Sequence, residues 1–230
     1  MPTARETLLE AAHTAVGAQP WAGVRMVDVA GAAGVSRQTL YNEFGTKEGL
    51  GAALVGRLID GFVEGAARAA AEGGRGGTDP AASCAAAGAW MLRTARDEPI
   101  VRAALTGCWG SPMPLPVVAV PDGGGREGGV RDGSARTVGR AGMDDADGMD
   151  GLGPSAGVRP GEPGVLAARL CDRVLEGLSP NGSSGRLGPA CEAGMRIALS
   201  HVVAPAAERT EEEAVGQIRE VVRALLAHHR

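Results

Sequence analysis

The 230-residue chain contains little lysine and few aromatic residues. Lys47 is the only lysine among 23 basic residues, and three Trp, two Phe and one Tyr make up the aromatic 3%. With 44% hydrophobic residues and so few aromatics, a core must be built from Ala, Val and Leu. Glycine, with 37 residues, is roughly twice as frequent as its usual share of about 7%. Together with abundant Arg and Ala, this composition is typical of a GC-rich coding sequence, so a single glycine is weak evidence for a turn.

The sequence also lacks an excess of positive charge. Its formal net charge is −4, which excludes a globally basic nucleic-acid coat, so any nucleic-acid contact must come from a local patch. No apolar run approaches the roughly 18 uncharged residues that a membrane span needs. The N-terminus shows neither signal-peptide nor transit-peptide features. We therefore expect a cytoplasmic protein that does not contact a membrane.

The four cysteines are widely scattered and form no CxxC or CxxH pair. This pattern favours neither a disulfide framework nor a zinc site. We expect them to act as small apolar side chains in a reducing compartment. They are Cys84, Cys108, Cys171 and Cys191.

Apolar residues recur with helical spacing along most of the chain, and no segment indicates a sheet. Thr3 followed by Glu6 predicts a capping box at the start of a first helix, which residues 17–20 would end. Trp21 is expected to fold back onto that helix as part of the core. Three glutamates at 211–213 favour the start of the last helix. We predict an all-α protein with further apolar faces at Leu50, Leu54, Leu58 and Phe62; Cys84, Ala87, Met91 and Ala95; 100–105; Leu166, Leu170 and Val174; Cys191, Met195, Leu199 and Val202; and Val215, Ile218, Val222, Leu225 and Leu226.

Residues 26–44 indicate two short helices joined by a tight turn. The first is expected at 28–33, after which Gly34 can adopt the left-handed conformation that ends a helix. Ser36 is suited to cap a second helix at 37–43. A short helix with one thin buried stripe is suited to the major groove of DNA, although spacing alone leaves an ordinary helical hairpin open. Leu40 and Phe44 form the stripe, and the free side carries Arg37, Gln38, Thr39, Tyr41 and Asn42.

Residues 121–163 differ in composition from the rest of the chain. These 43 residues contain 13 Gly, 4 Pro, 13 charged residues and no aromatic residue. Such a segment buries too little apolar surface to offset the entropy lost on ordering. We expect a disordered insertion between two helices of the C-terminal part.

Two motifs inside this segment are better explained by chance. Gly123, Gly125 and Gly128 match the G-x-G-x-x-G pattern, but no helical pattern follows to bind a pyrophosphate. The aspartates between 144 and 150 lack the spacing and closing Glu of a calcium loop, which favours a solvated charge run. These aspartates are Asp144, Asp145, Asp147 and Asp150.

The sequence carries no recognised catalytic or cofactor motif. It contains no G-x-S-x-G elbow, no Walker loop and no H-E-x-x-H helix. Its four histidines are not placed beside a nucleophile and an orienting carboxylate in the sequence. We therefore expect no catalytic residues, no enzyme activity, no cofactor and no bound metal.

Residues 3–50 resemble the DNA-binding domain of the TetR family of one-component transcriptional repressors, here of the GC-rich, actinobacterial type. The run from Asp28 to Leu50 matches the helix-turn-helix signature of that family almost position for position. The resemblance covers about a fifth of the chain, and the remainder agrees in being helical and of suitable length. The match is specific because several groups must coincide: Ala33-Gly34-Val35-Ser36, Leu40-Tyr41, Phe44 and Lys47-Glu48.

The resemblance implies which side chains face DNA. Arg37 and Gln38 would read bases, because Arg pairs bidentately with guanine and Gln with adenine. Tyr41 and Lys47 match positions that usually hold phosphates. The other residues expected at this face are Ser36, Thr39 and Asn42.

One residue departs from the family pattern. Arg25 stands where the family often has Thr at the start of the second helix, which loses a cap but offers a guanidinium for an altered phosphate contact. Residues 1–60 carry a net charge of −1. With few phosphate contacts per subunit, we expect binding to need a dimer and to fall steeply with salt.

The resemblance also implies the remaining architecture. Residues 1–48 would form the DNA-binding domain, and 49–230 would bind an effector and dimerise. The last two helices, at about 189–203 and 210–228, would build the homodimer interface, and two-fold symmetry predicts a pseudo-palindromic operator of double-stranded DNA. An unknown small molecule would then release the repressor.

The pocket for this effector is predicted only from bulky side chains, each of which is better explained as part of the core. A cavity lined by Ala, Leu and Met would favour an apolar or acyl ligand. The candidates are Phe62, Trp90, Met91, Cys108, Trp109, Met113 and Met195.

Two other hypotheses stay open at this level. The chain could be a helical ligand-binding or enzymatic protein with a vestigial helix-turn-helix. It could also bind DNA without an effector pocket and respond to a partner through residues 121–163. The sequence favours a repressor but leaves an activator role open.

Overall fold

The computed structural model describes residues 1–74, 79–109, 114, 163–178, 185–206 and 208–227. All regular structure in these ranges is helical, which confirms the predicted all-α class. A 3₁₀ turn, η1 (Trp21–Gly23), follows the first helix. The α-helices are α1 (Ala4–Ala18), α2 (Met26–Ala32), α3 (Arg37–Phe44), α4 (Lys47–Gly73), α5 (Pro80–Asp97), α6 (Pro99–Thr106), α7 (Pro163–Leu178), α8 (Leu187–Val203) and α9 (Glu211–Ala227).

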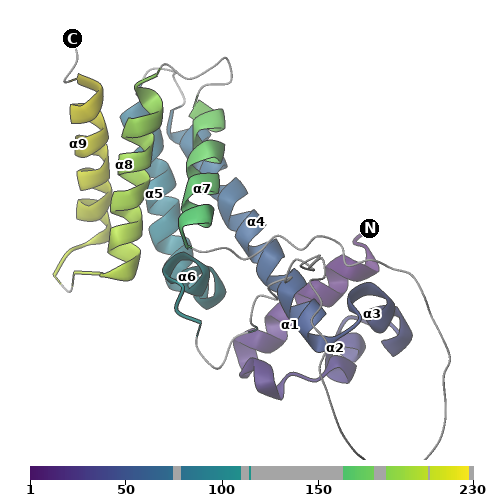
Figure 1. Cartoon of the computed structure of the whole chain (residues 1–230). Helices are drawn as coiled ribbons and strands as arrows, with labels where there is room; N and C mark the ends of the chain where they lie inside the picture. Colours follow the sequence, from purple (N-terminus) through teal and green to yellow (C-terminus); the bar gives the residue numbers. More distant parts are fainter. Residues whose placement is uncertain (75–78, 110–113, 115–162, 179–184, 207, 228–230) are drawn as a thin grey trace, which may run out of the picture.

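Helices α1, α2 and α3 form a small N-terminal unit against the first turns of α4 (Figure 1). The capping box at Thr3 is confirmed, because its hydroxyl accepts the Glu6 N–H at 3.2 Å and Glu6 accepts the Thr3 N–H at 2.7 Å. Leu8, Leu40 and Leu50 are fully buried between these helices. The sequence predicted that the first helix of the helix-turn-helix begins at Asp28. In the structure it begins at Met26, because Arg25 occupies the N-cap position.

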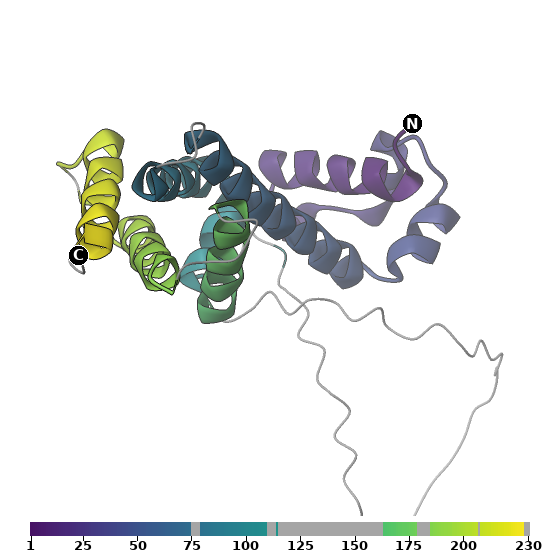
Figure 2. The ribbon, with the colours of Figure 1, turned by 90° about the horizontal axis from the view of Figure 1, so that it is seen from above.

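Helix α4 belongs to both parts of the molecule, as a single element of 27 residues (Figures 1 and 2). Thr46 caps it by accepting the Gly49 N–H at 3.0 Å. Leu54 and Phe62 are buried as predicted, whereas Leu58 is half-buried because Ile59 takes the inward position of that turn. The boundary expected after residue 48 falls in the first turn of α4, so the two parts share a helix instead of a linker.

Helices α5, α7, α8 and α9 pack with α4 into a bundle, and α6 lies across its end nearest the N-terminal unit (Figure 1). Helix α5 is central and contacts α4, α8 and α9. Both views place α8 and α9 at the end farthest from α1–α3 (Figures 1 and 2). The predicted face of α5 is buried from Cys84 to Ala95. Ion pairs of Arg169 with Asp60 and of Arg173 with Glu64, each 2.7 Å, join α7 to α4.

Small residues allow these helices to approach closely. A Cβ atom on Gly65 of α4 would lie 2.2 Å from Cζ2 of Trp90 on α5. A Cβ on Gly88 of α5 would lie 2.6 Å from Cδ1 of Ile218 on α9. A chain poor in aromatic residues therefore uses one of its few tryptophans to fill the space beside a glycine.

The segment expected to be disordered lies outside the described residues, except for Pro163, which begins α7. Its glycine pattern and its aspartate cluster lie outside the described ranges as well.

Candidate nucleic-acid interface

The turn between α2 and α3 has the conformation that the sequence predicts. Gly34 adopts a φ of +69°, in the left-handed region that favours glycine. The Val35 N–H donates to the Ala30 carbonyl at 3.0 Å and closes the end of α2. This turn fixes the direction in which α3 leaves the core.

Helix α3 is held at its N-terminus by a cap and along one side by two apolar residues. The Ser36 hydroxyl accepts the Thr39 N–H at 3.0 Å, which satisfies a backbone donor that the helix itself cannot. Leu40 is fully buried and Phe44 is 9% exposed. The opposite side of the helix is therefore presented to solvent on a fixed frame.

The outer face of α3 carries an ordered pair of amides beside an arginine. Gln38 Nε2 donates to Asn42 Oδ1 at 2.8 Å. This bond leaves Gln38 with its carbonyl oxygen and one N–H, the acceptor and donor that a bidentate contact with adenine uses. Arg37 is exposed on the same helix and forms no ion pair within the described residues.

Tyr41 and Thr39 differ in how freely they face outward. Tyr41 is 50% exposed, and its phenol has no hydrogen-bond partner in the part of the chain that the structure describes. Thr39 is half-buried, and its hydroxyl lies 2.9 Å from the Ser36 hydroxyl. Ser36 and Thr39 therefore hold the helix start, while Tyr41 is available to an outside partner.

Lys47, the only lysine of the chain, joins the start of α4 to the connection after α1. Its Nζ donates to the Ala22 carbonyl at 3.1 Å and lies 5.2 Å from the centre of the Trp21 ring. Trp21 in turn packs on α4 at Gly51, where a Cβ would lie 2.9 Å from its ring. The sequence suggested the first helix as its neighbour. An ammonium group has three donors, so Lys47 keeps donors for a phosphate at the N-terminus of α4.

Arg25 is paired more fully than the sequence indicated. Its Nε and Nη2 donate to the two carboxylate oxygens of Asp28 at 2.7 and 3.1 Å. This hydrogen bonding raises the pKa of Arg25. No side chain caps α2, as expected for a position that lacks Thr. A phosphate at this helix start would meet an arginine whose charge Asp28 already balances.

Arg5 contributes to this face through a contact that sequence reasoning missed. Its Nη1 donates to the Glu43 carbonyl at 3.3 Å and lies 3.5 Å from the Glu43 carboxylate. Its guanidinium carbon also lies 4.7 Å from the centre of the Phe44 ring. Arg5 and Glu43 are 38 residues apart, so helical spacing gives no signal for this pair. The contact neutralises the acid nearest the end of α3.

A short helix with a fixed outer face of Arg, Gln, Asn and Tyr, entered by a tight turn, defines a helix-turn-helix DNA-binding protein. Residues 8–54 match the family model described as bacterial regulatory proteins, tetR family. The N-terminal helix-turn-helix unit therefore matches the DNA-binding domain of the TetR family, as its motif suggested.

The N-terminal part of the chain is also similar to a known regulator. The chain is 42% identical over 60 residues to the HTH-type transcriptional regulator AlkX of Mycobacterium tuberculosis. That alignment spans 26% of this chain and 28% of the relative, so it concerns the DNA-binding end alone.

The overall fold is similar to that of a solved TetR-family repressor. The crystal structure of the TetR-family repressor AlkX from Dietzia sp. covers 96% of this chain and 95% of its own, with a TM-score of 0.53 and 20% identity. A TetR transcriptional regulator from Rhodococcus sp. RHA1 aligns over 99% of this chain and 98% of its own, with a TM-score of 0.48 and 18% identity.

The C-terminal bundle contains a cavity of about 620 Å³ between α5, α6, α7 and α8. Met91 and Met195, two of the side chains predicted to line a pocket, lie on its wall. The other wall residues are largely apolar, and charged groups add a polar edge. The apolar ones include Leu105, Leu170, Leu175 and Leu199, and the charged ones are Asp172, Glu192 and Arg196.

The other pocket candidates that the structure describes do not line this cavity. Phe62 is 2% exposed within the core, and Trp90 donates its indole N–H to the Phe62 carbonyl at 3.0 Å. Trp109 is half-buried against the core, and Met113 lies outside the described residues. Phe62, Trp90 and Trp109 therefore pack the bundle without lining this cavity.

Three of the cysteines are buried, in keeping with the small apolar role expected of them, whereas Cys108 is exposed. Burial raises the pKa of Cys171 to about 12, and a contact with Cys84 raises that of Cys191. These thiols stay protonated at neutral pH. Within the described ranges, no cluster of three or more His, Cys, Asp or Glu is suited to a metal, and none of the helices described could cross a membrane.

Proposed function

We propose that this regulator is a homodimeric repressor that binds a pseudo-palindromic operator through α3 and is released by a small molecule. The observation that carries the proposal is the outer face of α3, where Arg37 and the Gln38–Asn42 pair face solvent with base-reading atoms free. Tyr41 and Lys47 flank this face as phosphate contacts, and Ser36 and Thr39 hold its start. Arg25 contributes less than an unpaired arginine would, because Asp28 balances its charge.

The dimer is supported by apolar side chains left exposed on the last two helices. Val203 at the end of α8 and Leu225 near the end of α9 are 56% and 43% exposed. Ile197 and Val221 are half-buried on the same helices. A two-fold interface joins the same patch of each copy, so α8 and α9 would pack against their counterparts. Two reading helices related by this axis would contact two half-sites of the operator.

The effector is supported by the 620 Å³ cavity with its Met91 and Met195 wall. A mainly apolar wall with a few charged groups at its edge suits an apolar or acyl chain with a polar head. The solved Dietzia repressor is implicated in the biodegradation of n-alkanes, so dodecane and dodecanoate are the first compounds to test. Such a ligand releases the protein from DNA only if it favours the conformation that does not bind the operator.

The test is a fluorescence-anisotropy titration of the full-length protein on DNA from its own upstream intergenic region. It is run at two salt concentrations beside a scrambled duplex. We expect selective binding that weakens steeply with salt, and a release by dodecane or dodecanoate. Arg37→Ala should weaken the binding about tenfold or more, whereas Arg68→Ala, which removes an equally exposed arginine from α4, should not.

Three results would each contradict a part of the proposal. The repressor function is contradicted if the protein binds both duplexes equally and weakly and a genome-wide DNA selection then enriches no sequence. Unchanged affinity of Arg37→Ala for a selected operator would remove α3 as the reading element. Sedimentation of a monomer at the concentrations that saturate the operator would remove the dimer.

A further inference from the structure

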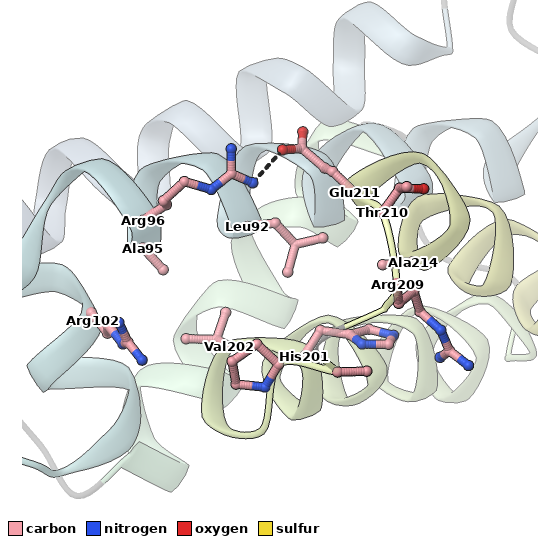
Figure 3. A pocket seen from close by; sticks show the side chains of 12 residues that line it. Leu92, Ala95, Arg96, Arg102, His201, Val202, Arg209, Thr210, Glu211 and Ala214 are labelled. Carbon is pink, nitrogen blue, oxygen red and sulfur yellow. Dashed lines mark hydrogen bonds and ion pairs between the residues drawn. The ribbon is translucent and has the colours of Figure 1, made fainter.

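A second, smaller cavity lies away from the effector cavity, at the corner where α5, α6, α8 and α9 meet (Figure 3). It has a volume of about 240 Å³. Its floor is apolar and includes Leu92, Ala95, Val202 and Ala214. Its edge carries Arg96, Arg102, His201, Arg209 and Glu211. The cavity therefore joins an apolar floor to a mainly cationic edge, in a chain whose net charge is −4.

The only carboxylate on this edge is already engaged. Glu211 accepts from Arg96 Nη2 at 2.6 Å and from Arg93 Nη1 at 3.2 Å, using a different oxygen for each. Figure 3 shows the Arg96–Glu211 contact on one side of the cavity. Glu211 therefore balances the arginines of α5 and leaves none of its charge for the other side.

Two arginines of the edge form no ion pair within the described residues, although Arg209 also lines a neighbouring pocket with Glu208, Glu213 and Glu220. Arg102 forms no ion pair within the described residues, and Arg209 donates to the neutral amide oxygen of Gln217 at 2.7 Å. His201 Nε2 lies 3.2 Å from the same oxygen. Figure 3 shows His201 between Arg102 and Arg209. The edge thus carries two guanidinium groups without an ion pair among the described residues, and Arg209 shares its acceptor with the His201 imidazole.

This lack of counter-charge is unusual within the molecule. Most described arginines contact a carboxylate: Arg5, Arg25, Arg57, Arg93, Arg96, Arg169, Arg173, Arg196, Arg219 and Arg223. Arg37, which faces the operator in the proposed function, does not, and neither does Arg68 on α4. Arg102 and Arg209 also lack a carboxylate contact among the described residues, and both line the same cavity.

From these observations we infer that the 240 Å³ cavity binds a small organic carboxylate. Its carboxylate pairs with the Arg102 guanidinium, whose planar donors match two oxygens. Its short apolar body covers the floor formed by Leu92 and Val202. The ligand class follows from both halves of the site: a bare anion leaves the floor empty, and a neutral molecule leaves the guanidinium without its partner.

The position of this site gives the ligand a route to the DNA-binding unit. Arg102 lies one turn after Glu98, and Glu98 at the start of α6 contacts His13 of α1 at 2.8 Å. A carboxylate on Arg102 would thus fix the helix that touches the N-terminal unit. This consequence rests on the proposed function, whereas binding of the carboxylate does not.

The experiment measures binding without DNA. Sodium hexanoate is titrated into the full-length protein by calorimetry, beside hexanamide, its neutral analogue, and inorganic phosphate. We expect hexanoate to bind about tenfold or more tightly than either. Arg102→Gln removes the charge but keeps a polar side chain at an exposed position, and it should weaken hexanoate binding about tenfold. Arg68→Gln, the matched control, should change nothing.

Two further variants separate this site from the larger cavity. Arg196→Gln removes the guanidinium at the edge of that cavity, and Ala167→Leu fills part of its wall. Hexanoate affinity should be the same in both variants as in the wild type. The inference is overturned if hexanoate binds Arg102→Gln normally, if either of these variants abolishes binding, or if hexanamide or phosphate binds as tightly. Each of these outcomes can be measured even if the protein does not bind DNA, because the titrations contain no DNA.

Discussion

His13 on α1 and Glu98 at the start of α6 form a hydrogen-bonded pair, with 2.8 Å between Nε2 and Oε2. The residues are 85 positions apart, and the pair joins the DNA-binding unit to the C-terminal bundle beside the shared helix α4. A second link is the Arg57–Glu10 ion pair, in which Arg57 also donates to the Glu6 carbonyl at 3.3 Å. Polar contacts from both α6 and α4 therefore hold α1 of the N-terminal unit in place.

The first prediction concerns communication through this pair. Operator binding should slow hydrogen exchange in α6 of the wild type, because α1 is fixed by DNA and holds Glu98 through His13. In His13→Ala the protection of α3 should persist and that of α6 should fall. Exchange measured by mass spectrometry checks this, with Thr14→Ala on the exposed side of α1 as control. Equal protection of α6 in His13→Ala and wild type would assign the communication to α4 alone.

The amide pair on α3 gives a prediction about sequence reading. Gln38→Ala should relax the preference for one A·T position, with a loss of about 1–3 kcal/mol of discrimination. Asn42→Ala should reduce the same preference by a smaller amount, because it frees the Gln38 amide to rotate. A double-mutant cycle on operators that differ at that base pair measures the coupling. Additive losses would show that the two amides act independently.

The close contact between α4 and α5 predicts a large effect of one methyl group. Gly65→Ala places a Cβ 2.2 Å from Trp90 Cζ2, and the indole is held by its bond to the Phe62 carbonyl. We expect a loss of about 1–3 kcal/mol in the free energy of unfolding. Gly61→Ala, where no atom lies within 4 Å of the new Cβ, is the matched control on the same helix. Urea unfolding of both variants measures the difference, and equal midpoints would contradict the close packing.

Acid stability should depend on Asp79. Hydrogen bonds from Arg219 and from the Ala82 N–H hold the pKa of Asp79 below its ordinary value. A carboxyl whose pKa is lower in the folded state stabilises the protein above its ordinary pKa of about 3.9 and loses this effect as pH falls through the folded value. Asp79→Asn keeps a residue suited to cap α5 but removes the charge.

This variant should therefore be less stable than wild type at pH 7, and the difference should shrink below about pH 4. Denaturant unfolding at pH 7, 5 and 3.5 measures it. Asp97→Asn at the exposed end of the same helix should show no such trend. A difference that stays constant down to pH 3.5 would assign the loss to something other than the charge of Asp79.

Much of the helical framework was predictable because its signals are local. The Thr3–Glu6 capping box, the Ser36 and Thr46 caps and the left-handed Gly34 each depend on residues within a few positions of one another. The face of α5 from Cys84 to Ala95 follows from its period alone. These features depend on short segments of the sequence, and the folded structure shows each of them.

The contacts that complete the site were not predictable, because they join residues far apart in the sequence. The pairing of Arg5 with Glu43 and of Lys47 with the Ala22 carbonyl depends on how α1 packs beside α3 and α4. The residues of an effector pocket were predicted from side-chain size alone, and two of them, Met91 and Met195, line the 620 Å³ cavity. Size alone also selected Phe62 and Trp90, since a large apolar side chain in a core and one at a cavity wall look the same in a sequence.

The continuity of α4 makes it a lever arm between the bundle and the DNA-binding unit. Twenty-seven residues at 1.5 Å each span roughly 40 Å. A tilt of about 5° at its bundle end would displace the other end by about 3.5 Å, close to the rise of one base pair in duplex DNA. In the proposed dimer, a repacking of the bundle too small to alter its core could therefore move each α3 out of register with its operator half-site.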